Sequence, residues 1–214
     1  MVKKLNFDGL NTKEIFSIIY EENYWGSDQS ISGTGSELIQ TNNLKSKLEK
    51  AFKIYQFKSI LDAPCGDFNW MKQVNLNGIQ YTGLDIVDKL IQSNKSQYGD
   101  LDNVKFRVGN IFEDQLPNAD LILCRDCLVH FSFADIAKAV ENIKKSSSKY
   151  LLTTSFINFQ SNQDIQTGYW RPINLQMEPF NFPDPILIID EKCTEVEGKY
   201  KDKSLLLWEI KNIS

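Results

Sequence analysis

Between residues 57 and 156, short apolar runs alternate with segments of helical pattern, and no other feature constrains the fold as strongly. The runs are nearly continuous, as in strands that are buried on both faces of a parallel sheet. They span residues 57–64, 79–86, 104–111, 119–127 and 149–156. The segments between them predict helices over 69–76, 88–99 and 132–146. The sequence therefore predicts an α/β fold with a mostly parallel sheet and helices on both faces.

The flanking segments complete a single predicted domain over residues 1–214. We expect an N-terminal helical cap, a cofactor-binding core, a substrate-covering connection and a C-terminal antiparallel hairpin. These parts span residues 1–56, 57–156, 157–185 and 186–214, respectively. The hairpin strands are predicted at 186–191 and 204–211, which brings the sheet to about seven strands. The connection is rich in Asn, Gln, Pro and aromatic residues, and a loop of that length is usually functional or disordered.

Composition limits the partners and the location. The net charge is −4, which argues against a general nucleic-acid-binding surface. No apolar run approaches the roughly 18 residues of a membrane span, and none follows the N-terminal lysines as in a secretory signal. Four cysteines suit a reducing compartment. We expect a cytoplasmic monomer or homodimer that binds neither membrane nor nucleic acid.

The segment "CRDC" contains a C-x-x-C pair, Cys124 and Cys127. Such a pair can belong to a zinc site or a redox site. A structural zinc needs about four ligands, and Cys65, Cys193 and the single histidine have no suitable spacing. A redox pair should open a helix, whereas this one closes an apolar run. We therefore expect no metal site.

The stretch "ILDAPCGD" at 60–67 begins a series of polar residues at the ends of predicted strands. The series consists of Asp62 with Pro64 and Gly66, then Asp85, Asn110 and Asp126. In an open parallel sheet, ligands bind beyond these carboxyl ends. Gly66 lets a ligand approach the backbone, the Asp85 carboxylate suits ribose hydroxyls, and the Asn110 amide suits an adenine edge. The series predicts a nucleotide site.

The turn after the first strand is poorly suited to a pyrophosphate. Pro64 replaces the first glycine of a dinucleotide motif, and Asp67 would repel phosphate. S-adenosylmethionine carries no phosphate, and its ammonium and sulfonium would be stabilised beside Asp62 and Asp67. A nicotinamide-dependent oxidoreductase and a non-catalytic nucleotide-binding protein remain the alternatives.

Four motifs in this order resemble the nucleotide-site motifs of class I S-adenosylmethionine-dependent methyltransferases: "ILDAPCGDFNWM", "YTGLDI", "VGNIFED" and "LILCRDCLVHF". The segments "WGSDQSISGTGSE" and "GYWRPINLQMEPFNFPDP" resemble a small bacterial subgroup linked to modification of surface (capsular) polysaccharides. The resemblance covers residues 22–211 and implies the Rossmann-like class I methyltransferase fold. Pro64 and Phe68 depart from it, since the wider family usually has glycines there.

The resemblance also implies which residues bind the cofactor, S-adenosyl-L-methionine. Asp62 and its neighbours would line the methionine part, Asp85 would hold the ribose, and the residues around Asn110 would flank the adenine. Segment 32–36 would close over the cofactor, although its composition also fits a flexible linker. The implied set is Trp25, Ser32, Gly33, Ser36, Asp62, Ala63, Pro64, Gly66, Asp85, Ile86, Asn110, Ile111 and Arg125.

His130 is the only histidine and follows the fourth predicted strand. A neutral imidazole can take the proton that an acceptor hydroxyl loses. Asp126 would orient that ring or act as the base itself. The alternatives are a structural histidine and a loop acid that caps residues 127–131.

Arg171 stands in the long connection, in "TGYWRPINL". With Tyr169, Trp170 and Asn174 it is predicted to select the acceptor, and its guanidinium favours an anionic one. A surface arginine stacked on Trp170 is the alternative. The predicted function is methyl transfer to an oxygen of a small anionic or sugar-derived acceptor, such as a phosphoramidate-like group or a sugar of a capsular polysaccharide. Transfer to nitrogen stays open.

Overall fold

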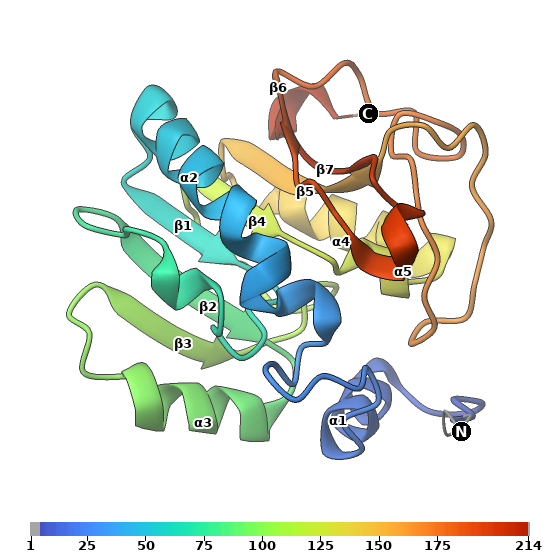
Figure 1. Cartoon of the computed structure of the whole chain (residues 1–214), viewed down its shortest axis with the longest axis horizontal. Coiled ribbons are helices and arrows are strands. Elements are labelled where there is room, and N and C mark those ends of the chain that lie inside the picture. Colours follow the sequence, from blue (N-terminus) through green and yellow to red (C-terminus); the bar gives the residue numbers. More distant parts are fainter. Residues whose placement is uncertain (1–4, 214) are drawn as a thin grey trace.

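The computed structural model describes residues 5–213, which form a seven-stranded sheet with helices on both faces (Figure 1). The strand order is β3-β2-β1-β4-β5-β7-β6. The strands are β1 (Ser59–Asp62), β2 (Gln80–Asp85), β3 (Val104–Val108), β4 (Leu121–Cys124), β5 (Tyr150–Phe156), β6 (Leu187–Asp190) and β7 (Lys203–Glu209). Strands β1 to β5 pair in parallel, whereas β7 runs antiparallel to both β5 and β6. The predicted sheet and its antiparallel C-terminal pair are confirmed.

Two apolar layers hold the helices to the sheet. Helices α2 (Leu38–Tyr55) and α3 (Asp88–Tyr98) share one cluster with Leu121 and Leu123 of β4. Helix α4 (Phe133–Lys145) packs in the other cluster, against Ile122 of the same strand. Successive side chains of a strand point to opposite faces, so a continuous apolar run fills both layers. The expected helices on both faces are confirmed.

The segments outside the core differ in part from expectation. Helix α1 (Thr12–Glu21) lies to one side of the sheet, whereas α2 lies across it as a structural layer (Figure 1). Residues 69–76 form no α-helix, and their only regular element is a 3-10 helix at Met71–Gln73 (η2). The prediction of a helix there is wrong because the backbone becomes extended at Val74, with ψ of 137°, and this ends the 3-10 helix after one turn.

The last two strands are joined by residues 191–202, which contain the short helix α5 (Glu195–Gly198). Val196 and Glu197 have left-handed backbone conformations inside this helix. This connection has the length that the predicted hairpin strands leave between them, and it passes over the ends of β4 and β5 (Figure 1). Within residues 5–213, no helix is long and apolar enough to span a bilayer.

Candidate functional site

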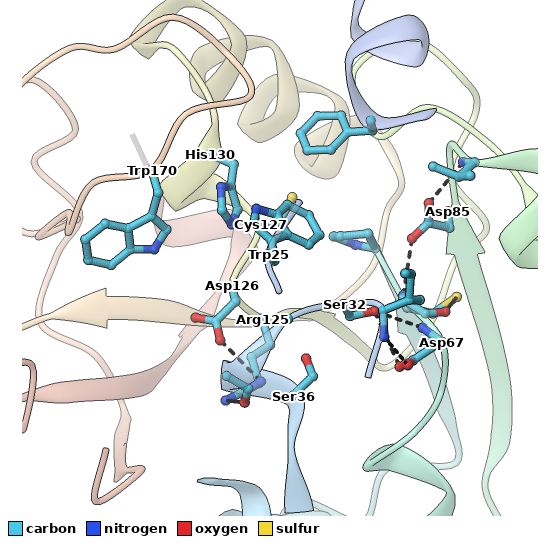
Figure 2. A pocket seen from close by; sticks show the side chains of 18 of the residues that line it. Trp25, Ser32, Ser36, Asp67, Asp85, Arg125, Asp126, Cys127, His130 and Trp170 are labelled. Carbon is cyan, nitrogen blue, oxygen red and sulfur yellow. Dashed lines mark hydrogen bonds and ion pairs between the residues drawn. The ribbon is translucent and has the colours of Figure 1, made fainter. Parts of the chain in front are cut away.

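A cavity of about 470 Å³ opens at the carboxyl ends of β1, β2 and β4 (Figure 2). Its volume falls in the roughly 300–1,000 Å³ range of ligand sites. It is lined by residues from the segments 25–36, 62–70, 84–90, 109–112, 125–131 and 193–203, together with Phe16, Phe156 and Trp170. The position agrees with the prediction that the strand ends form the site.

The turn after β1 shapes one wall of the cavity. Gly66 has a φ of +55°, and a Cβ on it would lie 2.3 Å from Ser32 Oγ. Both the backbone conformation and the lack of space therefore require glycine at this position. Pro64 and Gly66 line the cavity, as predicted for the cofactor set, but Ala63 does not. The prediction that Ala63 lines the methionine part of the cofactor is corrected. Its side chain is fully buried in the core beneath the turn and does not reach the cavity.

Asp85 connects the end of β2 to the same turn. One oxygen accepts the Gly66 backbone N–H at 3.2 Å and the other accepts the Val87 N–H at 3.0 Å. Burial raises the pKa of Asp85 to about 6, even though these hydrogen bonds lower it. Each carboxylate oxygen can accept a second hydrogen bond, so capacity remains for a ligand hydroxyl in the cavity.

The predicted adenine end lies beside Asp85. Ile86, Asn110 and Ile111 all line the cavity, as does the ring of Phe112. Asn110 Oδ1 accepts the Phe112 N–H at 3.0 Å, while its Nδ2 donates to no group among residues 5–213. An apolar pocket with one free amide donor suits the face and edge of a purine.

Asp62 is buried and pairs with a residue that the sequence did not suggest, Tyr81. The Tyr81 hydroxyl donates to Asp62 at 2.6 Å. Burial raises the pKa of Asp62 to about 7, with Asp85 adding to the effect. Asp62 therefore lines the cavity as a hydrogen-bonded acid that can hold a proton near neutral pH.

Residues 30–32 are fastened over the cavity by Asp67. One Asp67 oxygen accepts from Ser30 Oγ at 2.9 Å and from the Ile31 N–H at 3.0 Å. The Asp67 N–H in turn donates to Ser32 Oγ at 3.0 Å. These bonds argue against a flexible linker. They also give Asp67 a different role from the expected one beside a cofactor cation.

Trp25, Ser32, Gly33 and Ser36 all line the cavity, which agrees with the predicted closing segment. Arg125 holds this segment from below, because its Nη2 donates to the Gly35 carbonyl at 2.9 Å. The same nitrogen donates to Glu191 at 2.6 Å. Arg125 thus lines the cavity as predicted, and it joins the end of β4 to segment 32–36 and to the residue after β6.

Asp126 is held between two cations. Lys203 Nζ lies 2.5 Å and Arg125 Nη1 lies 3.2 Å from its Oδ2. Burial opposes ionisation, but Arg125 and Lys203 outweigh it and lower the pKa of Asp126 to about 2. A carboxylate this acidic is a poor proton acceptor at neutral pH, and it makes no hydrogen bond to His130. The prediction that Asp126 serves as base, or orients that ring by a hydrogen bond, is corrected.

His130 lines the same cavity, and its Nδ1 lies 3.0 Å from the Tyr169 carbonyl oxygen. This contact places the ring proton on Nδ1 and leaves Nε2 with a lone pair. Burial lowers the pKa of His130 to about 4. The Trp25 ring lies 4.8 Å away between centroids (Figure 2). His130 is therefore a neutral imidazole at pH 7, with Nε2 unbonded within residues 5–213.

Only one of the four residues predicted to select the acceptor lines the cavity, Trp170. The Tyr169 hydroxyl donates to the Leu5 carbonyl, and Asn174 Nδ2 donates to the Phe159 carbonyl. The Tyr169 side chain therefore points toward the N-terminal segment, and that of Asn174 points into the connection. The prediction that Tyr169 and Asn174 contact the acceptor with their side chains is corrected.

Arg171 is buried and also lies outside the cavity lining. Its guanidinium donates to the carbonyls of Leu128, Phe131 and Gln163 at 2.9, 2.7 and 3.0 Å. All three nitrogens are thus engaged by the backbone. The prediction that Arg171 anchors an anionic acceptor is wrong; the residue ties segment 163–171 to the loop that carries His130.

Residues that the sequence did not single out complete the cavity wall opposite the adenine end. They come from β5, β7 and the connection between β6 and β7, and are Phe156, Cys193, Glu195, Val196, Tyr200 and Lys203. Their positions depend on β7 pairing beside β5, which strand patterns alone do not determine. The four cysteines are free and buried. Across residues 5–213, no cluster of three or more His, Cys, Asp or Glu side chains could hold a metal ion.

Known proteins with a similar sequence or structure include methyltransferases. Residues 60–148 match a family model described as a methyltransferase domain. No curated protein matches the chain. Human N-acetylserotonin methyltransferase in complex with SAM has a similar structure, with a TM-score of 0.62 at 16% identity over 94% of this chain and 60% of that one.

Two further structures share the fold. Magnesium protoporphyrin IX methyltransferase from Synechocystis PCC 6803 with bound SAM gives a TM-score of 0.54 at 12% identity, over 76% of this chain and 82% of that one. TnmH gives a TM-score of 0.60 at 14% identity, over 80% of this chain and 55% of TnmH. The chain thus spans only part of the human enzyme and of TnmH. Its fold is the Rossmann-like fold of class I methyltransferases, as predicted.

The contacts of Arg171 predict a structural role that can be measured. We expect Arg171→Met to lower the free energy of unfolding by about 3 kcal/mol or more, because three carbonyls lose a charged donor. Denaturant unfolding would measure the change. Arg107→Met is the matched control, since Arg107 is exposed on β3. Equal stability of the two variants would contradict the structural role.

Proposed function

We propose that this chain, whose residues 60–148 match a methyltransferase domain, transfers a methyl group from S-adenosylmethionine to an oxygen of a small molecule. One observation carries the proposal. A single cavity joins the Asp85 and Gly66 pair, which suits a ribose, to a neutral His130 with a free Nε2.

S-adenosylmethionine is the cofactor, and the donor set of the cavity fits it. Asp85 offers acceptors to the ribose hydroxyls, and Asn110 offers a donor to the adenine. Asp62 lines the cavity and would ionise beside an ammonium, because a neighbouring cation lowers the pKa of a carboxyl group. The Asp85 carboxylate would repel the pyrophosphate of a dinucleotide, and it already engages the Gly66 N–H that could hold a phosphate. Two of the structural neighbours contain SAM, which supports the same choice.

His130 acts as the general base in this proposal. When bound, the cofactor supplies a methyl group that is already activated by the sulfonium. The remaining task is to remove the proton from the acceptor hydroxyl, and His130 Nε2 can receive it. The Tyr169 carbonyl holds the Nδ1–H and stabilises the imidazolium that results. The low pKa keeps Nε2 unprotonated throughout the neutral range, and it also makes the ring a weaker base than a free imidazole.

The contacts of Arg171 remove the reason to expect an anionic acceptor. The expected anionic acceptor rested on Arg171, whose nitrogens are occupied. That a sugar of a surface polysaccharide is the acceptor stays a prediction from the resemblance of the sequence. We propose transfer to oxygen because His130, a neutral base in the cavity wall, is suited to deprotonate a hydroxyl, whereas a neutral amine needs no base to attack.

The cofactor assignment predicts selective binding. S-adenosylhomocysteine should bind and raise the melting temperature, whereas NAD should do neither. We expect Asp85→Asn to weaken S-adenosylhomocysteine binding by about 1.5–3 kcal/mol, through loss of charge-assisted hydrogen bonds to the ribose. Calorimetry would give the Kd. Asp100→Asn, in an exposed turn, should match the wild type. An unchanged Kd for Asp85→Asn would remove Asp85 from the ribose role.

The assignment of His130 as base predicts a loss of rate without a loss of cofactor affinity. We expect His130→Gln to lower kcat by about 100- to 10,000-fold, the range for a general base. The Kd of S-adenosylhomocysteine should not change, because the base contacts the acceptor. Release of S-adenosylhomocysteine in single-turnover assays would measure the rate. A kcat close to that of the wild type would return His130 to a structural role.

The protonation state of His130 can be tested without any acceptor. Since it is the only histidine, its Cε1–H resonance needs no assignment in a protein without an affinity tag. We expect this signal to titrate at a pKa of about 4, well below the ordinary value near 6.5, because burial disfavours the charged ring. The ring should therefore gain its proton only in acid, and remain neutral above about pH 5. Titration near 6.5 would contradict the buried, neutral base.

A further inference from the structure

The wall of the cavity farthest along the sheet from Asp85 is built from rings. Phe156, Trp170 and Tyr200, with Val196, form what we call the aromatic wall. The Trp170 ring lies 4.9 Å from that of Tyr200 and 6.0 Å from that of Phe156, edge to face in both pairs. Such contacts hold the rings in fixed orientations. The aromatic wall is therefore a rigid apolar surface facing the cavity.

This surface is partly open to solvent. Trp170 is 41% exposed and Val196 is 64% exposed, although both line the cavity. Exposed apolar groups that converge on a concave site mark the place where a ligand buries them. The backbone of Val196 has a φ of +50°, a conformation that is uncommon for a β-branched residue. An unfavourable conformation that presents an apolar side chain at a cavity mouth points to a role in binding.

The polar groups near the aromatic wall are already paired with each other. Asp126 binds Lys203 and Arg125, and Glu195 Oε1 accepts the Thr34 hydroxyl at 2.7 Å. His130 Nε2 and the Tyr200 hydroxyl remain without a hydrogen bond in the described part of the chain. A sugar presents several hydroxyls, and each one that is buried without a partner costs free energy. The wall thus offers few partners to a polyol.

The charges in this half of the cavity do not favour an anion. Two cations, Arg125 and Lys203, face three carboxylates, those of Asp126, Glu191 and Glu195. Lys203 lies within ion-pair distance of all three carboxylates and Arg125 of Asp126 and Glu191, so the formal charge of these five groups sums to a negative value. Lys199 Nζ lies 5.4 Å from the Tyr200 ring centroid, but Lys199 does not line the cavity. Among the described residues that line this half of the cavity no cation is unpaired, so an anionic ligand would be disfavoured there.

We propose that the acceptor is an uncharged molecule with a hydroxyl on an aromatic ring, and that the aromatic wall selects it by packing against the ring face. The inference rests on the proposed function, which supplies the reaction. A C–O bond would form at the ring hydroxyl as the methyl C–S bond breaks with its electron pair left on sulfur, and the hydroxyl proton would pass to His130 Nε2. Trp170 is the most exposed ring of the aromatic wall and would be the main specificity residue.

Binding to the full chain saturated with S-adenosylhomocysteine tests the proposal by calorimetry. The probes are 4-methylphenol, which is neutral, 4-hydroxybenzoate, which carries a matched negative charge, and methyl β-glucopyranoside, a neutral polyol. We expect saturable binding of 4-methylphenol, at least about tenfold weaker binding of 4-hydroxybenzoate, and no binding of the glucoside. Tighter binding of the anion or the sugar, or no binding of 4-methylphenol at millimolar concentration, would overturn the proposal.

Variants assign the selectivity to the aromatic wall. Trp170→Ala should weaken 4-methylphenol binding by about tenfold or more, and Trp170→Phe should retain most of it. Neither should change the Kd of S-adenosylhomocysteine. Ile39→Ala is the control, since Ile39 is exposed on α2 and lies outside the cavity lining. Full binding by Trp170→Ala would overturn the role of the wall, whereas failure of the wild type to bind S-adenosylhomocysteine would instead refute the proposed function.

Discussion

The buried ion cluster around Arg125 is the interaction on which the site depends. Arg125 follows β4, Glu191 follows β6, and Lys203 begins β7, so the cluster joins the parallel and antiparallel parts of the sheet. Arg125 also holds the Gly35 carbonyl, which fixes the segment that covers the cavity. Burying these charges is costly, and their mutual pairing offsets that cost. Removing one member of such a pair typically costs about 3–5 kcal/mol, because the partner is left buried and uncompensated.

The same cluster separates the roles of the two neighbouring ionisable groups that were expected to act together. The cations hold Asp126 as an anion, whereas burial keeps His130 neutral. Their pKa values of about 2 and about 4 both lie below the physiological range, so neither group changes its charge there. Only His130 combines a free lone pair with an uncharged state. Two groups four positions apart in the sequence thus differ in charge at neutral pH, and only the second, His130, suits the proposed role of base.

The sequence allowed the strands, the edge of the sheet that carries the cavity and most residues that line the Asp85 end of the cavity to be predicted, because local patterns determine them. Buried strands have continuous apolar runs, and a polar residue after each run marks a strand end, as at Asp85 and Asn110. Roles that depend on distant partners could not be inferred. The structural role of Arg171 depends on hydrogen bonds to three backbone carbonyls, and these carbonyls come into position only when the whole connection folds. Likewise, nothing local marks Tyr81 as the partner of Asp62 or Lys203 as the partner of Asp126.

The position of β7 between β5 and β6 has a consequence for synthesis of the chain. Strand β6 leaves the ribosome before β7, yet β7 is its only partner in the sheet. Lys203, which pairs with Asp126, also arrives with β7. Domains generally fold as units, so the sheet and the part of the cavity wall that residues 193–203 contribute can be completed only after the chain through β7 has been synthesised.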